Sequence, residues 1–383
     1  MVLAATALAL SSGVSAPAHA ATDHALVLGY YVPYDATSWA SLEAHPEQLD
    51  VVAGQWVTID ACGGLSSRDD QTLKQFAHTH ALKVVPSLFT LSAGLNHLLL
   101  TDDATRASAL QNIVDYTVGE DYDGFDIDLE NVDPDDRGAF SGFVGDLASA
   151  LHEYGKLVTI AVPAKERDVT TGWAGAFDYA ALGSQVDLVT LMAYEYRGPF
   201  SGPGSVAPID WVRRVTAFAA RQIPANKLLL GLAFYGYDWN TSSGGAVSLG
   251  YPRAVALGDH FQAEATFDAV QQSLTFSYVS DSADRLPLDP PAHVASHSIT
   301  SRTAPACEVP PLPSLPAPTP PPPPPAGIPQ THEVWVEDGT SVAARLALAF
   351  SYHVRGVATW RLGLEDPGVW PVFEQWRSAD QGV

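Results

Sequence analysis

The chain has 383 residues, of which 46% are hydrophobic, so it can bury the core of one barrel-sized domain or of two ordinary ones. It carries 43 acidic residues against 20 basic ones, a formal net charge of −23, which argues against nucleic acid, anionic lipid and acidic polymers as partners. A neutral or cationic ligand is favoured, although an acidic surface can also serve solubility alone.

The first twenty residues have the pattern of a secretory signal. A short apolar run ends in an Ala-x-Ala sequence, which predicts cleavage after Ala20 and a mature chain of residues 21–383, extracellular or associated with the cell wall. The run lacks an initial Lys or Arg, which indicates a truncated start or a weak signal. No later segment has about 18 consecutive apolar residues, so the sequence predicts no membrane span.

Apolar runs that resemble strands alternate with helical patterns along most of the chain. Helices are predicted at residues 67–80, 102–118, 135–154, 175–184, 211–221 and 341–353, with a short one before residue 50. Eight strands are predicted, at residues 26–32, 50–59, 82–89, 123–130, 157–162, 186–194, 228–235 and 356–360. This alternation predicts an α/β fold, a closed (β/α)8 TIM barrel with an outer ring of helices.

The connection between the seventh and eighth predicted strands is much longer than the others. It predicts a small insertion, with a short helix near residues 251–260 and β-like pieces at 274–279 and 333–337. Residues 281–331 are rich in proline, including the run Pro320–Pro325, and are predicted to be a disordered excursion. An interdomain linker is the alternative, but too few residues follow it to form a separate domain.

Neither the cysteines nor the paired histidines predict a metal site. Cys62 and Cys307 are far apart in sequence, and Cys307 lies in the Pro-rich tract, so we expect them not to form a disulfide. His78 and His80 lack the spacing of a zinc site and are expected to mark one helix surface.

The run Asp123–Glu130 alternates acidic and apolar residues. Because side chains in a strand alternate between its two faces, Asp126, Asp128 and Glu130 share one face. Asp123 falls on the opposite face, so we expect it to have a structural role at the start of the strand. Neighbouring carboxylates oppose joint ionisation, which keeps one of them protonated and able to act as a general acid. A solvated edge strand and a calcium loop were the alternatives; the apolar opposite face argues against the first and the alternation against the second.

The active site of such a barrel lies at the carboxyl ends of its strands, where Glu130 is the last inward residue of the fourth strand. Met192 and Tyr194 share a face of the sixth strand. Trp360, at the end of the eighth, offers a flat surface for a sugar ring, with simple core filling as the alternative. Two further candidate substrate-binding residues are Tyr30, near the end of the first strand, and Glu195.

Four motifs resemble the family 18 glycoside hydrolases, the chitinase-like enzymes. They are the DGxDxDxE signature at residues 123–130, Met-Ala-Tyr-Glu at 192–195, Gly-Leu-Ala-Phe-Tyr-Gly at 231–236 and Gly-Val-Ala-Thr-Trp at 356–360. Residues 335–338 and 362–367 resemble the branch related to spore-cortex and cell-wall lytic enzymes.

The resemblance implies a role for each residue of the site. Glu130 would protonate the glycosidic oxygen, while the acetamido oxygen of the substrate attacks the anomeric carbon. Asp128 would orient the acetamido nitrogen, Asp126 would hold Asp128 and share its proton, and Tyr194 would bond the acetamido carbonyl. Trp360 would form the floor of the subsite that holds this sugar. The scheme needs no cofactor and no metal.

The resemblance leaves the polymer open. Glu195 stands where chitinases usually carry Asp, so its contact to the substrate is in doubt. The expected function is that of a secreted retaining hydrolase of β-linked N-acetylglucosamine glycans, chitin oligomers or peptidoglycan, acting as a monomer. The alternative is a lectin-like barrel that binds these glycans without cleaving them. The Pro-rich excursion could serve wall anchoring or partner binding.

Overall fold

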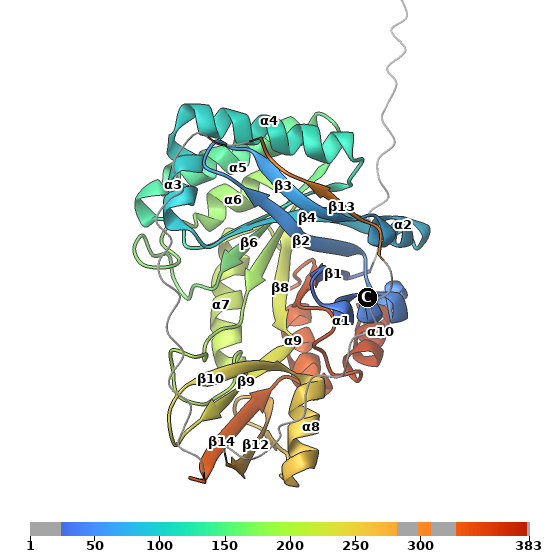
Figure 1. Cartoon of the computed structure of the whole chain (residues 1–383), viewed down its shortest axis with the longest axis vertical. Helices are drawn as coiled ribbons and strands as arrows, with labels where there is room; N and C mark the ends of the chain where they lie inside the picture. Colours follow the sequence, from blue (N-terminus) through green and yellow to red (C-terminus); the bar gives the residue numbers. More distant parts are fainter. Residues whose placement is uncertain (1–23, 282–296, 306, 308–326, 381–383) are drawn as a thin grey trace, which may run out of the picture.

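Eight parallel strands close into a barrel in the computed structural model, which describes residues 24–281, 297–305, 307 and 327–380 (Figure 1). Strand β1 pairs with both β2 and β15, which closes the ring. The barrel strands are β1 (Leu26–Tyr31), β2 (Val51–Ile59), β4 (Lys83–Thr90), β5 (Gly124–Leu129), β6 (Leu157–Pro163), β7 (Leu188–Met192), β8 (Leu228–Ala233) and β15 (Gly356–Trp360). The predicted (β/α)8 barrel is therefore confirmed.

Helices surround the barrel and cover the outward faces of the strands. They are α1 (Ala36–Ala44), α2 (Gln71–Thr79), α3 (Ala93–Thr101), α4 (Asp103–Gly119), α5 (Arg137–His152), α6 (Tyr179–Gln185), α7 (Ile209–Gln222), α9 (Gly339–Ser351) and α10 (Val369–Asp380), with short 3-10 turns η1 (Pro46–Gln48), η2 (Pro134–Asp136) and η3 (Ala225–Lys227). Several begin at an aspartate whose carboxylate accepts a bond from the first turn, as Asp178 does for α6. None of the helices described is long and apolar enough to cross a bilayer.

The predicted helix at residues 67–80 is wrong in its first part. Residues Leu65–Asp70 form strand β3, which runs antiparallel to β2, and helix α2 begins only at Gln71. A tight turn makes this hairpin: Asp60 accepts backbone bonds from Cys62 and Gly64, at 2.9 and 2.8 Å. Strand pairing thus overrides the helical pattern, a non-local effect that the local sequence does not reveal.

The insertion after β8 is an antiparallel sheet of five strands with one helix. In order across the sheet the strands are β10 (Ala246–Gly250), β9 (Tyr235–Asn240), β14 (Gln330–Val336), β12 (Ser273–Ser280) and β11 (Thr266–Asp268), and the helix is α8 (Tyr251–Phe261). Phe276, Val334 and Leu257 are buried where α8 packs on the sheet. The predicted helix and the two β-like pieces are confirmed, and Figure 1 shows this sheet at the lower end of the molecule.

Part of the tract predicted to be disordered is a strand. Residues Ile299–Arg302 form β13, which pairs antiparallel with β3 and so extends the barrel sheet beyond β2. His297 adds a 2.6 Å bond from its ring to Asp70. The signal sequence at 1–20, residues 282–296, residue 306 and residues 308–326, which include Pro320–Pro325, lie outside the described residues.

Cys62 and Cys307 form a disulfide, so the expectation that they stay unpaired is wrong. Strand β13 runs along β3 toward the tip of the β2–β3 hairpin, which brings Cys307 next to Cys62, with 5.7 Å between their Cα atoms. The separation of 245 residues along the chain was a poor guide to their distance in space. The disulfide fixes the end of the β13 segment to the barrel.

A buried ion pair joins the insertion to the barrel. Glu337 directly follows β14, and its carboxylate lies 2.8 Å from the guanidinium of Arg345 on α9. Ser205 and Ser273 donate hydroxyl bonds of 3.0 and 2.8 Å to the same carboxylate. Both charged side chains are almost completely buried, and each is compensated by the other.

Candidate active site

Strand β5 places the acidic residues as the alternation predicted. Phe125, Ile127 and Leu129 are buried in the core beneath the helices, while Asp126 and Asp128 point to the opposite, inner face. Glu130 follows the last strand residue, at the carboxyl end of the barrel. The pairing of β5 between β4 and β6 fixes this order, because a slip of one residue would exchange the two faces.

Asp126 is the innermost acid and is completely buried. Its two carboxylate oxygens accept bonds from the hydroxyls of Ser87, at 2.7 Å, and Thr159, at 2.5 Å. Burial raises its pKa, and the hydroxyl bonds oppose the rise. Among the described residues, no hydrogen bond joins the carboxyl groups of Asp126 and Asp128. The expected direct contact, in which Asp126 holds Asp128, is therefore absent. Asp126 instead acts on Asp128 through its charge.

Asp128 is nearly as buried as Asp126, but its carboxyl group accepts fewer hydrogen bonds. Gln55 donates one long bond of 3.4 Å to one oxygen, and the other oxygen has no hydrogen-bond partner among the described residues. Burial raises the pKa of Asp128 well above its ordinary value, and the charges of Glu130 and Asp126 add to the rise. An unpartnered buried carboxyl group is costly, and it leaves a polar atom free for a ligand.

Glu130 is held by its backbone, which leaves the side chain free at the mouth of the barrel. Its amide donates to Thr90 O at 2.9 Å, and its carbonyl accepts a 2.6 Å bond from the Asn96 side chain. Burial, and then the nearby Glu195 carboxylate, raise the pKa of Glu130 to about 6. A carboxyl group with this pKa is still partly protonated near neutrality and can donate a proton.

A cavity of about 230 Å³ brings all the predicted site residues except Asp126 together. It is lined by Tyr30, Asp128, Glu130, Met192, Tyr194, Glu195 and Trp360, together with Phe89, Leu91, Ala161 and Tyr235. The rings of Tyr30 and Trp360 pack with centroids 5.5 Å apart, so the floor of this cavity is aromatic. We call it the floor pocket.

Glu195 is positioned by two tyrosines that the sequence reasoning missed. The hydroxyls of Tyr235 and Tyr237 both donate to the same Glu195 oxygen, at 2.5 and 2.8 Å. The backbone of Glu195 is left-handed, with φ of 63°. Tyr235 and Tyr237 are two residues apart on β9 and share one face of that strand, a signal that could have identified them.

A second, larger cavity of about 500 Å³ continues from the floor pocket. The two share Glu130, Met192, Tyr194 and Glu195. The larger one is completed by Pro163, the last residue of β6, and by Ala164, Trp173, Phe200 and Trp211 from the chain that follows β6 and β7. Trp173 and Phe200 are lone aromatic residues in loops, which carry no periodic signal, so sequence reasoning did not find them.

Asp123 lies apart from the other acids, as its position at the start of the strand predicted. Its carboxylate accepts a 2.8 Å bond from the amide of Val84 and lies 3.0 Å from the ring of His78. These contacts tie β5 to β4 and α2. Asp123 therefore has a structural environment, at the opposite end of the strand from Glu130.

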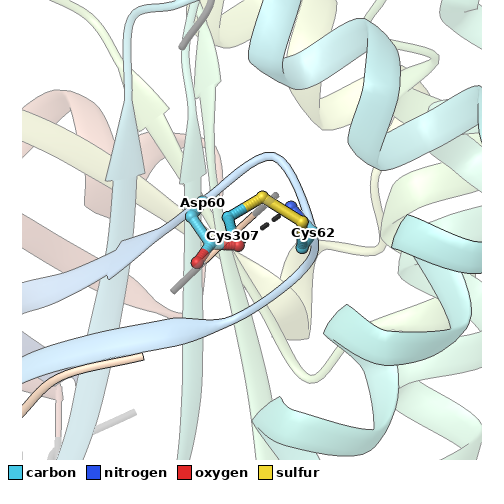
Figure 2. A group of neighbouring side chains, drawn as sticks. All are labelled: Asp60, Cys62 and Cys307. Atoms are coloured by element: carbon cyan, nitrogen blue, oxygen red, sulfur yellow. Dashed lines mark hydrogen bonds between the residues drawn. A yellow bond between two sulfur atoms is a disulfide. The ribbon is translucent and has the colours of Figure 1, made fainter. Parts of the chain in front are cut away.

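One group of three side chains in the described part of the chain has the spacing of a metal site. Figure 2 shows its members, Asp60, Cys62 and Cys307. Both sulfur atoms are committed to the disulfide, and Asp60 accepts backbone bonds within the hairpin turn. The group is a disulfide beside a capped turn, and its chemistry does not fit a metal centre, because the thiolate is the form of Cys that binds metal.

A barrel with buried carboxyl groups of raised pKa over an aromatic floor defines the site of a glycoside hydrolase. The model of the family described as Glycosyl hydrolases family 18 matches residues 26–302. The chain belongs to this family, as its four motifs predicted.

Relatives of this chain include a cortical fragment-lytic enzyme and an uncharacterized glycosylase. The cortical fragment-lytic enzyme of Bacillus subtilis is 28% identical over 281 residues, 72% of this chain and 54% of that protein. The uncharacterized glycosylase YvbX of the same organism is 24% identical over 356 residues, 90% of each chain. The chain thus spans about half the length of the first of these relatives.

A solved structure with the same fold is that of a chitinase from Chromobacterium violaceum. It superposes with a TM-score of 0.73 at 26% sequence identity, covering 92% of this chain and 98% of that one. The likeness extends over nearly all of both chains.

Proposed function

We propose that this protein is a secreted retaining hydrolase that cleaves β-linked N-acetylglucosamine glycans by substrate-assisted catalysis. The observation that carries the proposal is the floor pocket, where a carboxyl group with a pKa of about 6 stands beside a second buried carboxyl group with one unpartnered oxygen. The first provides a proton donor. The second provides a polar partner for a group that the substrate brings.

In the first step, Glu130 gives its proton to the glycosidic oxygen, and the bond from that oxygen to the anomeric carbon breaks. The acetamido carbonyl oxygen of the same sugar forms the new bond to the anomeric carbon, which gives a cyclic oxazolinium ion. Asp128 holds the acetamido nitrogen, where positive charge develops. Tyr194 donates its hydroxyl to the acetamido group, and Trp360 supports the ring from below.

In the second step, the Glu130 carboxylate takes a proton from water, and the water oxygen attacks the anomeric carbon. The oxazolinium ring opens, the acetamido group is restored and Glu130 is protonated again. Two displacements at one carbon give net retention of configuration. Every proton and electron pair is provided by the enzyme, the substrate or water.

The polymer that the enzyme meets is either chitin or peptidoglycan. Both contain N-acetylglucosamine, and the proteins similar to this chain include chitinases and cortical fragment-lytic enzymes. The floor pocket needs only the acetamido sugar. The proposal therefore names the linkage and the sugar at the site of cleavage, and it treats either polymer as a substrate.

The test is release of new reducing ends from chitohexaose and from peptidoglycan glycan strands. We expect the unaltered protein to release them and Glu130→Gln to lose at least about 10³-fold in kcat while still binding chitohexaose, because the amide keeps the shape but cannot donate the proton. If Glu130→Gln turned over chitohexaose as fast as the unaltered protein, the assignment of Glu130 as the proton donor would be contradicted.

The alternative function is a lectin-like barrel that binds these glycans without cleaving them. It predicts that both proteins bind chitohexaose and that neither releases reducing ends. Asp123→Asn is the matched control, since it changes an acid on the same strand that lies away from both cavities. Its turnover should be close to that of the unaltered protein.

A further inference from the structure

Strand β13 is the outermost strand of the barrel sheet, and the residues around it form a strap along β3. The strap is defined as residues 297–305 and 307. In addition to the β3–β13 ladder, the amide of Ser298 donates to Thr72 Oγ1 at 2.9 Å, and the amide of Ala304 donates to Ser66 Oγ at 3.0 Å. Without the strap, β3 would be the edge of the sheet, and its outer backbone groups would lose these partners.

Two side chains of the strap reach other parts of the barrel. The ring of His297 lies 2.6 Å from a carboxylate oxygen of Asp70, and the same oxygen accepts a 2.6 Å bond from the hydroxyl of Tyr31 on β1. Arg302 pairs with Glu120, after α4, at 2.7 Å. The strap therefore connects β1, β3 and the end of α4.

These non-covalent contacts bury little of the strap. His297, Ala304 and Cys307 are partly buried, and the other described residues of the strap are exposed. A short ladder with water on its outer side and an exposed ion pair each stabilise little, whereas fixing the segment costs conformational entropy. The contacts alone are therefore a weak hold on the strap.

The disulfide adds the strong constraint. Cys307 ends the strap, and its bond to Cys62 joins residues 245 positions apart in sequence. While this bond exists, the strap stays beside β3, and its effective concentration there is high. Both cysteines are only partly buried, so a reductant can reach the sulfur atoms. Breaking the bond should therefore free the strap.

Asp60 lies beside the disulfide, as Figure 2 shows. One of its carboxylate oxygens is within 4.8 Å of both sulfur atoms. The amides of Cys62 and Gly64 hold the carboxylate, at 2.9 and 2.8 Å. Attack by a thiolate brings negative charge onto the sulfur atoms, so a carboxylate fixed at this distance opposes the attack.

We propose that the Cys62–Cys307 disulfide is a redox-sensitive clasp: a dithiol opens it and frees the strap from β3, and Asp60 slows the opening. A thiolate of the dithiol attacks one sulfur atom and forms a mixed disulfide, and the other cysteine leaves. The second thiol of the dithiol then displaces the first cysteine. Two electrons and two protons pass from the dithiol, which becomes a disulfide, to Cys62 and Cys307, which become thiols.

The clasp is separate from the proposed reaction, because Asp60, Cys62 and Cys307 line neither cavity. It would keep the strap closed in an oxidising compartment and let it open in a reducing one. The inference therefore stands or falls independently of the proposed function.

Tryptic cleavage after Arg302 measures how often the strap opens. The protein is reduced with dithiothreitol, its thiols are blocked with iodoacetamide, and the reagents are removed before trypsin is added. We expect this treatment to speed cleavage after Arg302 at least about tenfold, because the site must leave β3 to be cut. Cleavage after Arg221, near the end of α7, is the control and should change less than about twofold.

The double variant Cys62→Ser with Cys307→Ser gives the open state without reagents and should be cut after Arg302 as fast as the reduced protein. Thiol titration before reduction should find neither of the two cysteines of the chain. Two free thiols at that stage would overturn the proposal. Equal cleavage after Arg302 in the oxidised and the fully reduced protein would also overturn it, whether or not the double variant folds.

Asp60→Asn tests the role of the carboxylate. The amide keeps an oxygen for the two backbone bonds but removes the charge, so reduction by dithiothreitol should be at least about threefold faster, and the difference should shrink in 1 M salt. The control is Asp121→Asn, which removes an exposed acid beyond the far end of α4 and should leave the rate unchanged. Equal rates for Asp60→Asn and the unaltered protein would contradict the role of Asp60.

Discussion

Two of the regions that bury carboxylates compensate the charge to different degrees, although burial raises the pKa in both. At the junction between insertion and barrel, Glu337 is paired with Arg345 and accepts two hydroxyl bonds. On β5, Asp128 and Glu130 have no cationic partner among the described residues, and each is pushed toward its protonated form by burial and by another acid. The compensated carboxylate supports the fold. Of the two uncompensated ones, Glu130 holds a proton where a substrate can use it.

The largest expected effect on stability comes from breaking the compensated pair. Glu337→Ala leaves the Arg345 guanidinium buried without its carboxylate, which typically costs about 3–5 kcal/mol. Urea denaturation should show this loss in the free energy of unfolding, while the folded fraction should keep its kcat. A loss below about 1 kcal/mol would show that Arg345 finds other partners without cost.

The matched change on β5 should behave in the reverse way. The pKa of Asp128 is raised in the fold, so the unfolded chain ionises first as pH rises, and native stability is lost between the unfolded pKa and the higher folded one. Asp128→Asn removes this cost. At pH 7.5 its free energy of unfolding should be equal to or higher than that of the unaltered protein, while kcat falls by at least about 10²-fold, because an amide cannot take up the negative charge that stabilises the developing oxazolinium ion. If Asp128→Asn lowered both the free energy of unfolding and kcat, the contrast between the two regions would be contradicted.

A smaller effect is expected from Glu195→Gln. The Glu195 charge is the second cause, after burial, of the raised pKa of Glu130. Activity requires protonated Glu130, so kcat/KM should fall as pH rises through about 6 in the unaltered protein. Without the Glu195 charge this limb should move to lower pH, toward the ordinary glutamate value of 4.5. If kcat/KM of Glu195→Gln falls at the same pH as in the unaltered protein, a group other than Glu195 determines that pH.

The barrel and the acids of β5 could be predicted because their signals are local. Eight apolar runs separated by helical patterns specify parallel strands buried on both faces, and the period of two places Asp126 and Asp128 on one face without any knowledge of their neighbours. The same alternation predicted the separate position of Asp123.

The rest depends on contacts between segments far apart in the chain. Strand β13 and the disulfide exist because a segment beyond residue 296 returns to the β2–β3 hairpin, and nothing within that segment specifies its partner. The lack of a hydrogen bond between Asp126 and Asp128 follows from Ser87 and Thr159, on two other strands. Trp173 and Phe200 belong to loops, where an aromatic residue alone does not indicate its neighbours.

The central claim is that the substrate's own acetamido group attacks the anomeric carbon while Glu130 provides the proton. Proton NMR of the first products from chitohexaose tests it directly, because the anomers of a freshly released sugar are distinguishable before they interconvert. The account predicts that the β-anomer appears first, as two successive displacements require. Appearance of the α-anomer first would show a single displacement by water and would contradict the account.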